Sequence, residues 1–208
     1  FWSAGRMALD GHAALAWDWK SIEATHAAIH GAKAASENFV SWHYPPPFLL
    51  VATLCSLLPY VWGLLLWQAS SLGAATWVAH RILPGRDALL AILGAPAVFI
   101  CLGHGQNGFL TAALLGGGLL LLDRRPIVAG VLLGCLIYKP QLALVLPLIL
   151  IAGGHWRALF AAAVAAMLLV AITLALWGWP VWQAFLDSLP LARHVLIEQG
   201  RIGWHKIQ

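Results

Sequence analysis

The chain has 208 residues, of which 61% are hydrophobic and 10% are charged, and its mean hydropathy is +0.81. Soluble domains carry about 25% charged residues, so this chain has too few polar side chains to cover a water-exposed surface. The formal net charge of +4 comes from scattered basic residues, which excludes a nucleic-acid-binding patch. We therefore expect an all-α fold, a polytopic transmembrane helical bundle with the lipid bilayer as its solvent.

We predict one membrane domain in three parts. Residues 1–44 are the most polar and are predicted as an extracytoplasmic loop with one or two short helices. Residues 45–177 are predicted as the transmembrane helical region, and residues 178–208 as a second extracytoplasmic loop. The chain begins at Phe1 without a signal sequence and ends in a polar stretch, so we expect an internal fragment that is incomplete at both ends.

Apolar runs fill the central part. They cover residues 48–58, 60–79, 88–102, 109–122, 127–138, 142–152 and 158–177. Only 60–79 and 158–177 reach the roughly 20 residues that cross a bilayer as a helix. A run of about 14 residues spans roughly 21 Å of a hydrocarbon core that is about 30 Å thick. The short runs therefore need tilting, local bilayer thinning or ends inside a polar cavity, unless their boundaries are drawn too tightly.

Basic residues in short loops favour the cytoplasmic side of a membrane. If 60–79 runs inward, one face receives the five arginines Arg81, Arg86, Arg124, Arg125 and Arg157. The polar motifs and both end loops then share the extracytoplasmic face of a multi-pass protein of the cell membrane. This topology requires run 48–58 to be re-entrant or interfacial, because a full span there would separate the motifs from the first loop.

His43 and Tyr44 directly precede three prolines at the start of the first apolar run. Proline is tolerated in the first turn of a helix, where its missing N–H costs nothing, so both side chains are expected at the membrane surface. They are candidate substrate-binding residues. The alternative is an ordinary interfacial anchor.

Residues 103–108 form a polar hairpin between two apolar runs, with three glycines around His104, Gln106 and Asn107. The glycines allow a tight turn, but such a turn does not require the two amides or the imidazole. We therefore interpret these three side chains as candidate ligands for hydroxyl or phosphate groups.

Tyr138, Lys139, Pro140 and Gln141 interrupt another apolar stretch. A lysine is costly in such a stretch, and the proline breaks the helix at the point where the lysine stands. A cation at this junction suits a phosphate or carboxylate, so Lys139 and Gln141 are candidate substrate-binding residues. The alternative is a lysine that extends to the membrane surface.

The remaining polar residues lie in the two end loops. Asp18 is better placed than Asp10 for a general base, although a loop carboxylate is ordinarily only solvated. Arg201 and Lys206 are candidate contacts for an anionic group. The three cysteines, Cys55, Cys101 and Cys135, lie in apolar runs without metal-ligand spacing, so neither a metal site nor a cofactor is expected.

Several strings occur in a particular order along the chain. They are residues 1–6, 17–19, 44–48, 58–60 with Trp67, 105–107, 129–130, 138–140 and 200–206. Together they resemble glycosyltransferase family 87, the polyprenol-phosphate-mannose-dependent membrane mannosyltransferases with the GT-C fold.

This resemblance implies an inverting hexosyltransferase that acts outside the cytoplasmic membrane. Its donor would be a polyprenyl-phosphate hexose, with mannose expected, and its acceptor a glycolipid or glycan hydroxyl. An acidic general base would activate that hydroxyl, and cationic and amide groups would stabilise the leaving phosphate. In the family the acid precedes the aromatic pair found here at Phe1 and Trp2, so we expect it upstream of Phe1 and expect the fragment alone to be inactive.

We consider two other functions, a transporter and a scaffold. Broken short spans and an intramembrane lysine also suit a transporter or flippase for a lipid-linked or anionic solute, although we find no clear internal repeat. A non-catalytic membrane scaffold would not need polar motifs gathered on one face.

Overall fold

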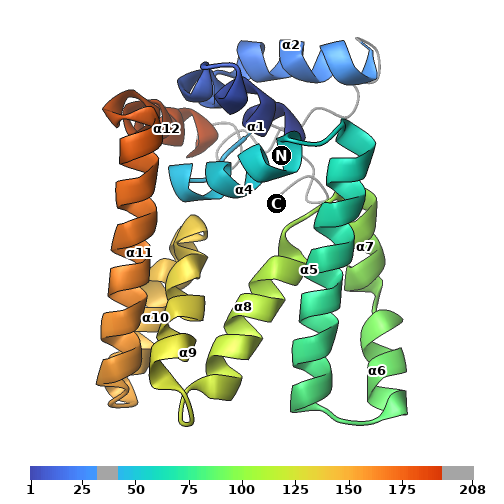
Figure 1. Cartoon of the computed structure of the whole chain (residues 1–208), viewed down its shortest axis with the longest axis vertical. Coiled ribbons are helices and arrows are strands. Elements are labelled where there is room, and N and C mark those ends of the chain that lie inside the picture. The colour runs from blue at the N-terminus through green and yellow to red at the C-terminus, as the bar shows by residue number, and fades with distance from the viewer. Residues whose placement is uncertain (32–41, 194–208) are drawn as a thin grey trace. The chain divides into compact units, whose positions relative to one another are not determined.

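The computed structural model describes residues 1–31 and 42–193, and the regular elements in this part of the chain are all helices (Figure 1). The structure therefore confirms the all-α class for the described residues. Arg201 and Lys206, two of the predicted site residues, lie outside them.

The chain divides into two compact units, which we describe separately. The first combines residues 1–63 with residues 170–208, and the second is residues 64–169. Helices α5 (Tyr60–Ile82) and α11 (Trp156–Trp177) connect the two units.

The first unit holds several short helices. They are α1 (Trp2–Leu9), the 3-10 helix η1 (Ala13–Trp17), α2 (Trp19–His30), α4 (Pro46–Ser56) and α12 (Trp179–Arg193). Helix α1 lies directly on α4, because a Cβ on Gly5 would stand 2.0 Å from the carbonyl oxygen of Ala52. Ser56 Oγ reinforces this contact by donating a 2.8 Å hydrogen bond to the carbonyl oxygen of Trp2.

The first end loop holds two short α-helices, as the sequence predicted, together with a 3-10 helix, whereas the helix in the second end loop was not predicted. The first holds α1, η1 and α2, and α12 extends through most of the described part of the second. The reason is aromatic packing over long sequence distances. The rings of Trp17 and Phe185 meet with centroids 6.2 Å apart, and Trp182 Nε1 donates a 3.1 Å hydrogen bond to Thr173 Oγ1.

The second unit contains most of α5 and α11, together with five shorter elements and one 3-10 turn. They are α6 (Arg86–Leu93), α7 (Pro96–His104), α8 (Gly108–Leu121), α9 (Pro126–Gly134), η2 (Cys135–Tyr138) and α10 (Pro140–Ala152). Pro96, Pro126 and Pro140 each begin a helix, the position at which a missing N–H costs nothing.

The apolar run 88–102, predicted as one stretch, is broken into α6 and α7. The break lies at Gly94 and Ala95, and Ala95 is extended with ψ of 134°. The ring of Pro96 disfavours helical backbone angles in the residue before it, so α6 ends and α7 starts anew.

Glycines allow the helices of the second unit to approach closely. A Cβ on Gly130 of α9 would lie 2.2 Å from the carbonyl oxygen of Ala158 in α11, and one on Gly134 would lie 2.4 Å from that of Ala162. Small residues four apart on each helix produce this kind of contact in membrane proteins.

Among the described helices, α11 is long and apolar enough to cross a membrane by itself. Helices α4 and α5 pass the same test only as a pair, and they are bent by 119° at their junction. A bend of this kind is what a re-entrant or interfacial run 48–58 would produce. Helices α8, α10 and the α9–η2 segment are apolar but shorter, so the multi-pass arrangement stays a prediction.

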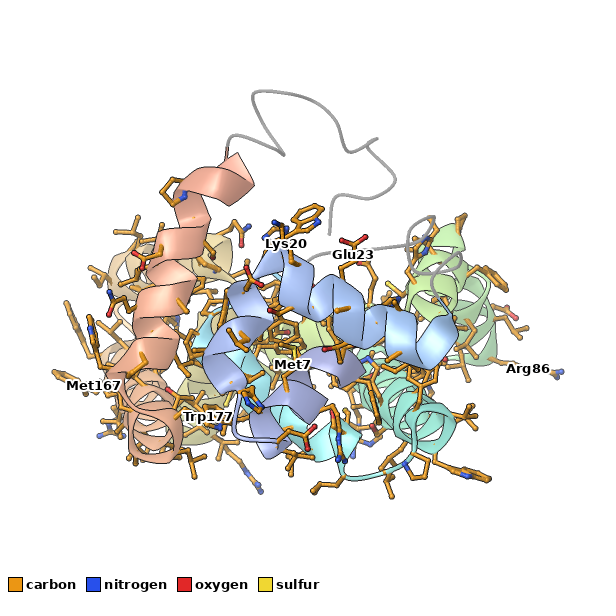
Figure 2. All side chains as sticks on the ribbon, turned by 90° about the horizontal axis from the view of Figure 1, so that it is seen from above. Met7, Lys20, Glu23, Arg86, Met167 and Trp177 are labelled. Carbon is orange, nitrogen blue, oxygen red and sulfur yellow. The ribbon has the colours of Figure 1, made fainter. Side chains whose placement is uncertain are left out.

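The outward faces of these helices are apolar. Leu144 of α10 is 74% exposed and Phe160 of α11 is 70% exposed. Met167, also exposed, lies on the outer side of the α11 ribbon (Figure 2). Surfaces of this composition are stable against lipid rather than water.

Candidate functional site

The connection between α7 and α8 is a tight turn, as the three glycines predict. Helix α7 ends at His104, and Gly105 follows in the left-handed conformation with φ of 62°. Helix α5 holds this turn from the side: Trp67 Nε1 donates to the carbonyl oxygen of Gly105 at 3.2 Å, and Gln68 Nε2 donates to that of Leu102 at 2.6 Å.

Sequence reasoning did not assign Trp67 or Gln68 to the site. Trp67 belongs to one of the strings that resemble family 87, and Gln68 is an amide within a largely apolar run, but neither signal indicates a partner. Their partners are backbone carbonyls more than 30 residues away, which no local pattern reveals.

Asn107 is the N-cap residue of α8 and is 2% exposed. Its backbone carbonyl accepts hydrogen bonds from the amide and the hydroxyl of Thr111, both at 3.0 Å. Its side-chain Nδ2 is buried and meets no hydrogen-bond acceptor within the described part of the chain. A buried donor without a partner costs about 1–3 kcal/mol, so this amide is a strong indication of a ligand.

Tyr138 and Lys139 stand where η2 ends and α10 begins. Tyr138 is 4% exposed, and its phenol oxygen lies 2.9 Å from Thr111 Oγ1. Lys139 is the N-cap residue of α10 and is half-buried. Neutralising this cation by binding an anion would remove much of the cost of burying it.

The structure thus brings together two short segments that are far apart in the sequence, residues 107–111 and 138–139. The contact between Thr111 and Tyr138 places Asn107 and Lys139 at the same end of the second unit. His104 is exposed, and its Nδ1 lies 2.9 Å from the carbonyl oxygen of Ile100. Gln106 is half-buried, whereas Gln141 is exposed in the first turn of α10.

His43 and Tyr44 belong to the other unit, where the Tyr44 ring packs in an aromatic cluster with Phe1, Trp42 and Phe48. The rings of Tyr44 and Phe48 are 4.6 Å apart, and Trp17 Nε1 donates a 3.1 Å hydrogen bond to the carbonyl oxygen of Tyr44. Burial lowers the pKa of His43, so its imidazole is neutral at neutral pH.

The two carboxylates of the first loop already have local partners. Asp18 is the N-cap residue of α2, and its Oδ2 accepts hydrogen bonds from the hydroxyl and the backbone amide of Ser21, which lower its pKa. Asp10 pairs with Arg6 at 3.0 Å. Among the described residues, no group of His, Cys, Asp and Glu could hold a metal ion.

The sequence model of glycosyltransferase family 87 matches residues 42–208. The chain belongs to glycosyltransferase family 87. Every predicted site residue except Asp18 lies in the matched range, whereas the strings at residues 1–6 and 17–19 precede it. No curated protein and no solved structure matches the chain. Family 87 membership makes the protein a membrane glycosyltransferase, with a sugar donor and an acceptor as its substrates.

Proposed function

We propose that this family 87 glycosyltransferase moves a hexose, with mannose as the sugar, from a polyprenyl-phosphate donor to a hydroxyl of a glycolipid or glycan on the extracytoplasmic face. The observation that carries this proposal is the half-buried Lys139 beside the Tyr138–Thr111 contact, among helices with apolar outer faces. A lipid-linked phosphate supplies both the anion for the cation and an apolar chain for the bilayer.

The reaction we propose is a single inverting displacement. The acceptor oxygen attacks the anomeric carbon, the bond from that carbon to the phosphate oxygen breaks, and the phosphate leaves with the electron pair. A carboxylate takes the hydroxyl proton. Lys139 stabilises the charge that builds up on the leaving phosphate.

The assay uses membranes from cells that produce the full-length protein, with labelled polyprenyl-phosphate mannose as donor, and the variants below are made in that full-length protein. We expect label in a glycolipid or glycan product with this donor, and little or none with polyprenyl-phosphate glucose or a nucleotide sugar. Transfer from the nucleotide sugar alone would overturn the proposed donor. Movement of the intact donor across the membrane without transfer would favour a flippase.

The role of Lys139 is tested with Lys139→Met and Lys139→Arg. Losing the cation removes a charge-assisted contact, so we expect Lys139→Met to lower transfer by about tenfold or more. We expect Lys139→Arg to retain part of the activity. Lys20→Met is the matched control, because Lys20 is exposed on α2 (Figure 2). Equal activity of Lys139→Met and Lys20→Met would exclude Lys139 from the site.

A further inference from the structure

The first turn of α8 contacts η2, the 3-10 turn that leads into α10. Thr111 closes the first turn of α8, and Tyr138 directly precedes Lys139, the N-cap residue of α10. The 2.9 Å contact between the Thr111 hydroxyl and the Tyr138 phenol oxygen therefore links the first turn of α8 to the residue before the N-cap of α10. These helices are 14 and 13 residues long.

Neither amino-terminal end is capped by a side chain. Asn107 and Lys139, the two N-cap residues, make no side-chain capping hydrogen bond. The amino-terminal end of a helix carries roughly half a positive charge, because its first N–H groups have no partner within the helix. In α10, Pro140 has no N–H and the Leu142 N–H donates to the Lys139 carbonyl oxygen, so this end offers the N–H of Gln141. Two such ends beside a lysine form a positively charged region.

The second unit has no acidic residue in α8, η2 or α10. Its acidic residues are Asp87 and Asp123. Asp87 lies in the first turn of α6, and Asp123 follows the carboxyl-terminal end of α8. The positive ends of α8 and α10 therefore have no built-in counter-ion on their own elements.

The buried amide of Asn107 is an independent sign of a ligand. It is 98% buried at the N-cap of α8, and its Nδ2 has no acceptor within the described residues. The Asn107 side chain makes no capping hydrogen bond to α8, so capping of this helix does not account for its burial. An anionic oxygen placed here would satisfy the N–H donor.

We infer that the amino-terminal ends of α8 and α10 form a phosphate-binding subsite, in which Asn107 Nδ2 and the Lys139 ammonium donate to phosphate oxygens. The inference rests on the proposed function and deepens it. The ligand is the phosphate diester of the donor before transfer and the polyprenyl phosphate monoester afterwards. Thr111 and Tyr138 are positioning residues, because their contact keeps the two helix ends together.

The test measures binding separately from sugar transfer. The thermal midpoint of the detergent-purified protein is followed with polyprenyl monophosphate, polyprenol, inorganic phosphate and phosphatidylglycerol. We expect a saturable rise in the midpoint with polyprenyl monophosphate and none with polyprenol. Equal affinity for phosphatidylglycerol would support the subsite but identify the ligand as a phospholipid headgroup. No rise with any phosphate compound would overturn the inference.

Asn107→Leu separates a binding role from a structural one. Replacing an unpaired buried amide with an apolar side chain of similar size should leave the ligand-free midpoint unchanged or higher. We expect the affinity for polyprenyl monophosphate to fall by about tenfold, the loss of one hydrogen bond to a charged group. Unchanged affinity would overturn the assignment of Asn107.

The positioning residues are tested with Tyr138→Phe, Thr111→Val and Thr111→Ser. The first two remove the hydroxyl contact, so we expect weaker binding of polyprenyl monophosphate and a higher donor KM with kcat less affected. Thr111→Ser keeps the hydroxyl and should restore binding. Tyr60→Phe in the other unit is the matched control. If Thr111→Ser binds as weakly as Thr111→Val, the positioning role is wrong.

The outcomes also distinguish this inference from the proposed function. Phosphate binding that Asn107→Leu abolishes, in a protein that transfers no hexose, would keep the subsite and reject the proposed reaction. Hexose transfer that Asn107→Leu leaves intact would keep the reaction and reject the subsite.

Discussion

The hydroxyl of Thr111 and the phenol oxygen of Tyr138 lie 2.9 Å apart although 27 residues separate them in the chain. Between them the chain leaves along α8, turns at Asp123–Arg125 and returns along α9 and η2. The contact therefore closes the far end of a helical hairpin. It fixes the relative position of Asn107 and Lys139, the two residues that we propose bind the donor phosphate.

The Thr111 hydroxyl and the Tyr138 phenol group should contribute jointly to the free energy of unfolding. We expect Thr111→Val and Tyr138→Phe each to lower the free energy of unfolding, and the double variant to lower it by less than the sum. A coupling of about 0.5–1.5 kcal/mol fits one buried hydrogen bond. Denaturation in detergent measures this, and strictly additive effects would show that the two groups do not interact.

The close approach of α9 and α11 should make Gly130 intolerant of a side chain. We expect Gly130→Ala to destabilise the protein by about 1–3 kcal/mol, because its Cβ would collide with the carbonyl oxygen of Ala158. Gly73→Ala is the matched control. Its Cβ would meet nothing within 4 Å in helix α5, so a gain of about 0.5–1 kcal/mol is expected. Equal effects in thermal unfolding would contradict this packing.

Asp18 should behave as a helix cap. We expect Asp18→Ala to cost about 1 kcal/mol of stability, and Asp18→Asn to cost much less because an amide oxygen also accepts from Ser21. Since Ser21 already occupies the Asp18 carboxylate, we expect Asp18→Asn to retain transfer activity. A stable but inactive Asp18→Asn variant would instead make Asp18 the general base.

His43 should make the first unit sensitive to acid. Burial lowers its pKa below the ordinary 6.5, so the unfolded chain takes up a proton at a higher pH than the folded one. The free energy of unfolding should therefore fall as the pH drops below about 6.5 and level off below the lowered pKa. We expect His43→Gln to reduce this dependence in pH-dependent unfolding, and an unchanged pH profile would exclude His43.

The topology can be tested at the turn between α8 and α9. If the arginines are cytoplasmic, an epitope tag inserted after Arg124 should be inaccessible in intact cells and accessible after permeabilisation. A tag between Leu83 and Arg86 should behave in the same way. Labelling of the Arg124 tag from outside would reverse the orientation and remove the proposed extracytoplasmic site.

Local features of the sequence were enough to predict several parts of the site. Gly105 predicts a turn because a left-handed residue there suits glycine, and Pro140 predicts a helix start because it lacks an N–H. The Gly94-Ala95-Pro96 break, which we did not predict, carries a signal of the same kind and could have been found. Hydrophobicity alone predicted the helical class, since backbone groups in an apolar environment must bond within helices.

Only the tertiary structure decided which of these residues lie close together in space. The sequence marked Asn107 and Lys139 as unusual, but their common location follows from the return of the chain between Thr111 and Tyr138. The burial of Asn107, the hold of Trp67 on Gly105 and the packing of α12 on Trp17 depend likewise on contacts between distant segments. Proline, glycine and periodicity act over a few residues, whereas these contacts depend on how glycine-lined helices pack, which no local pattern encodes.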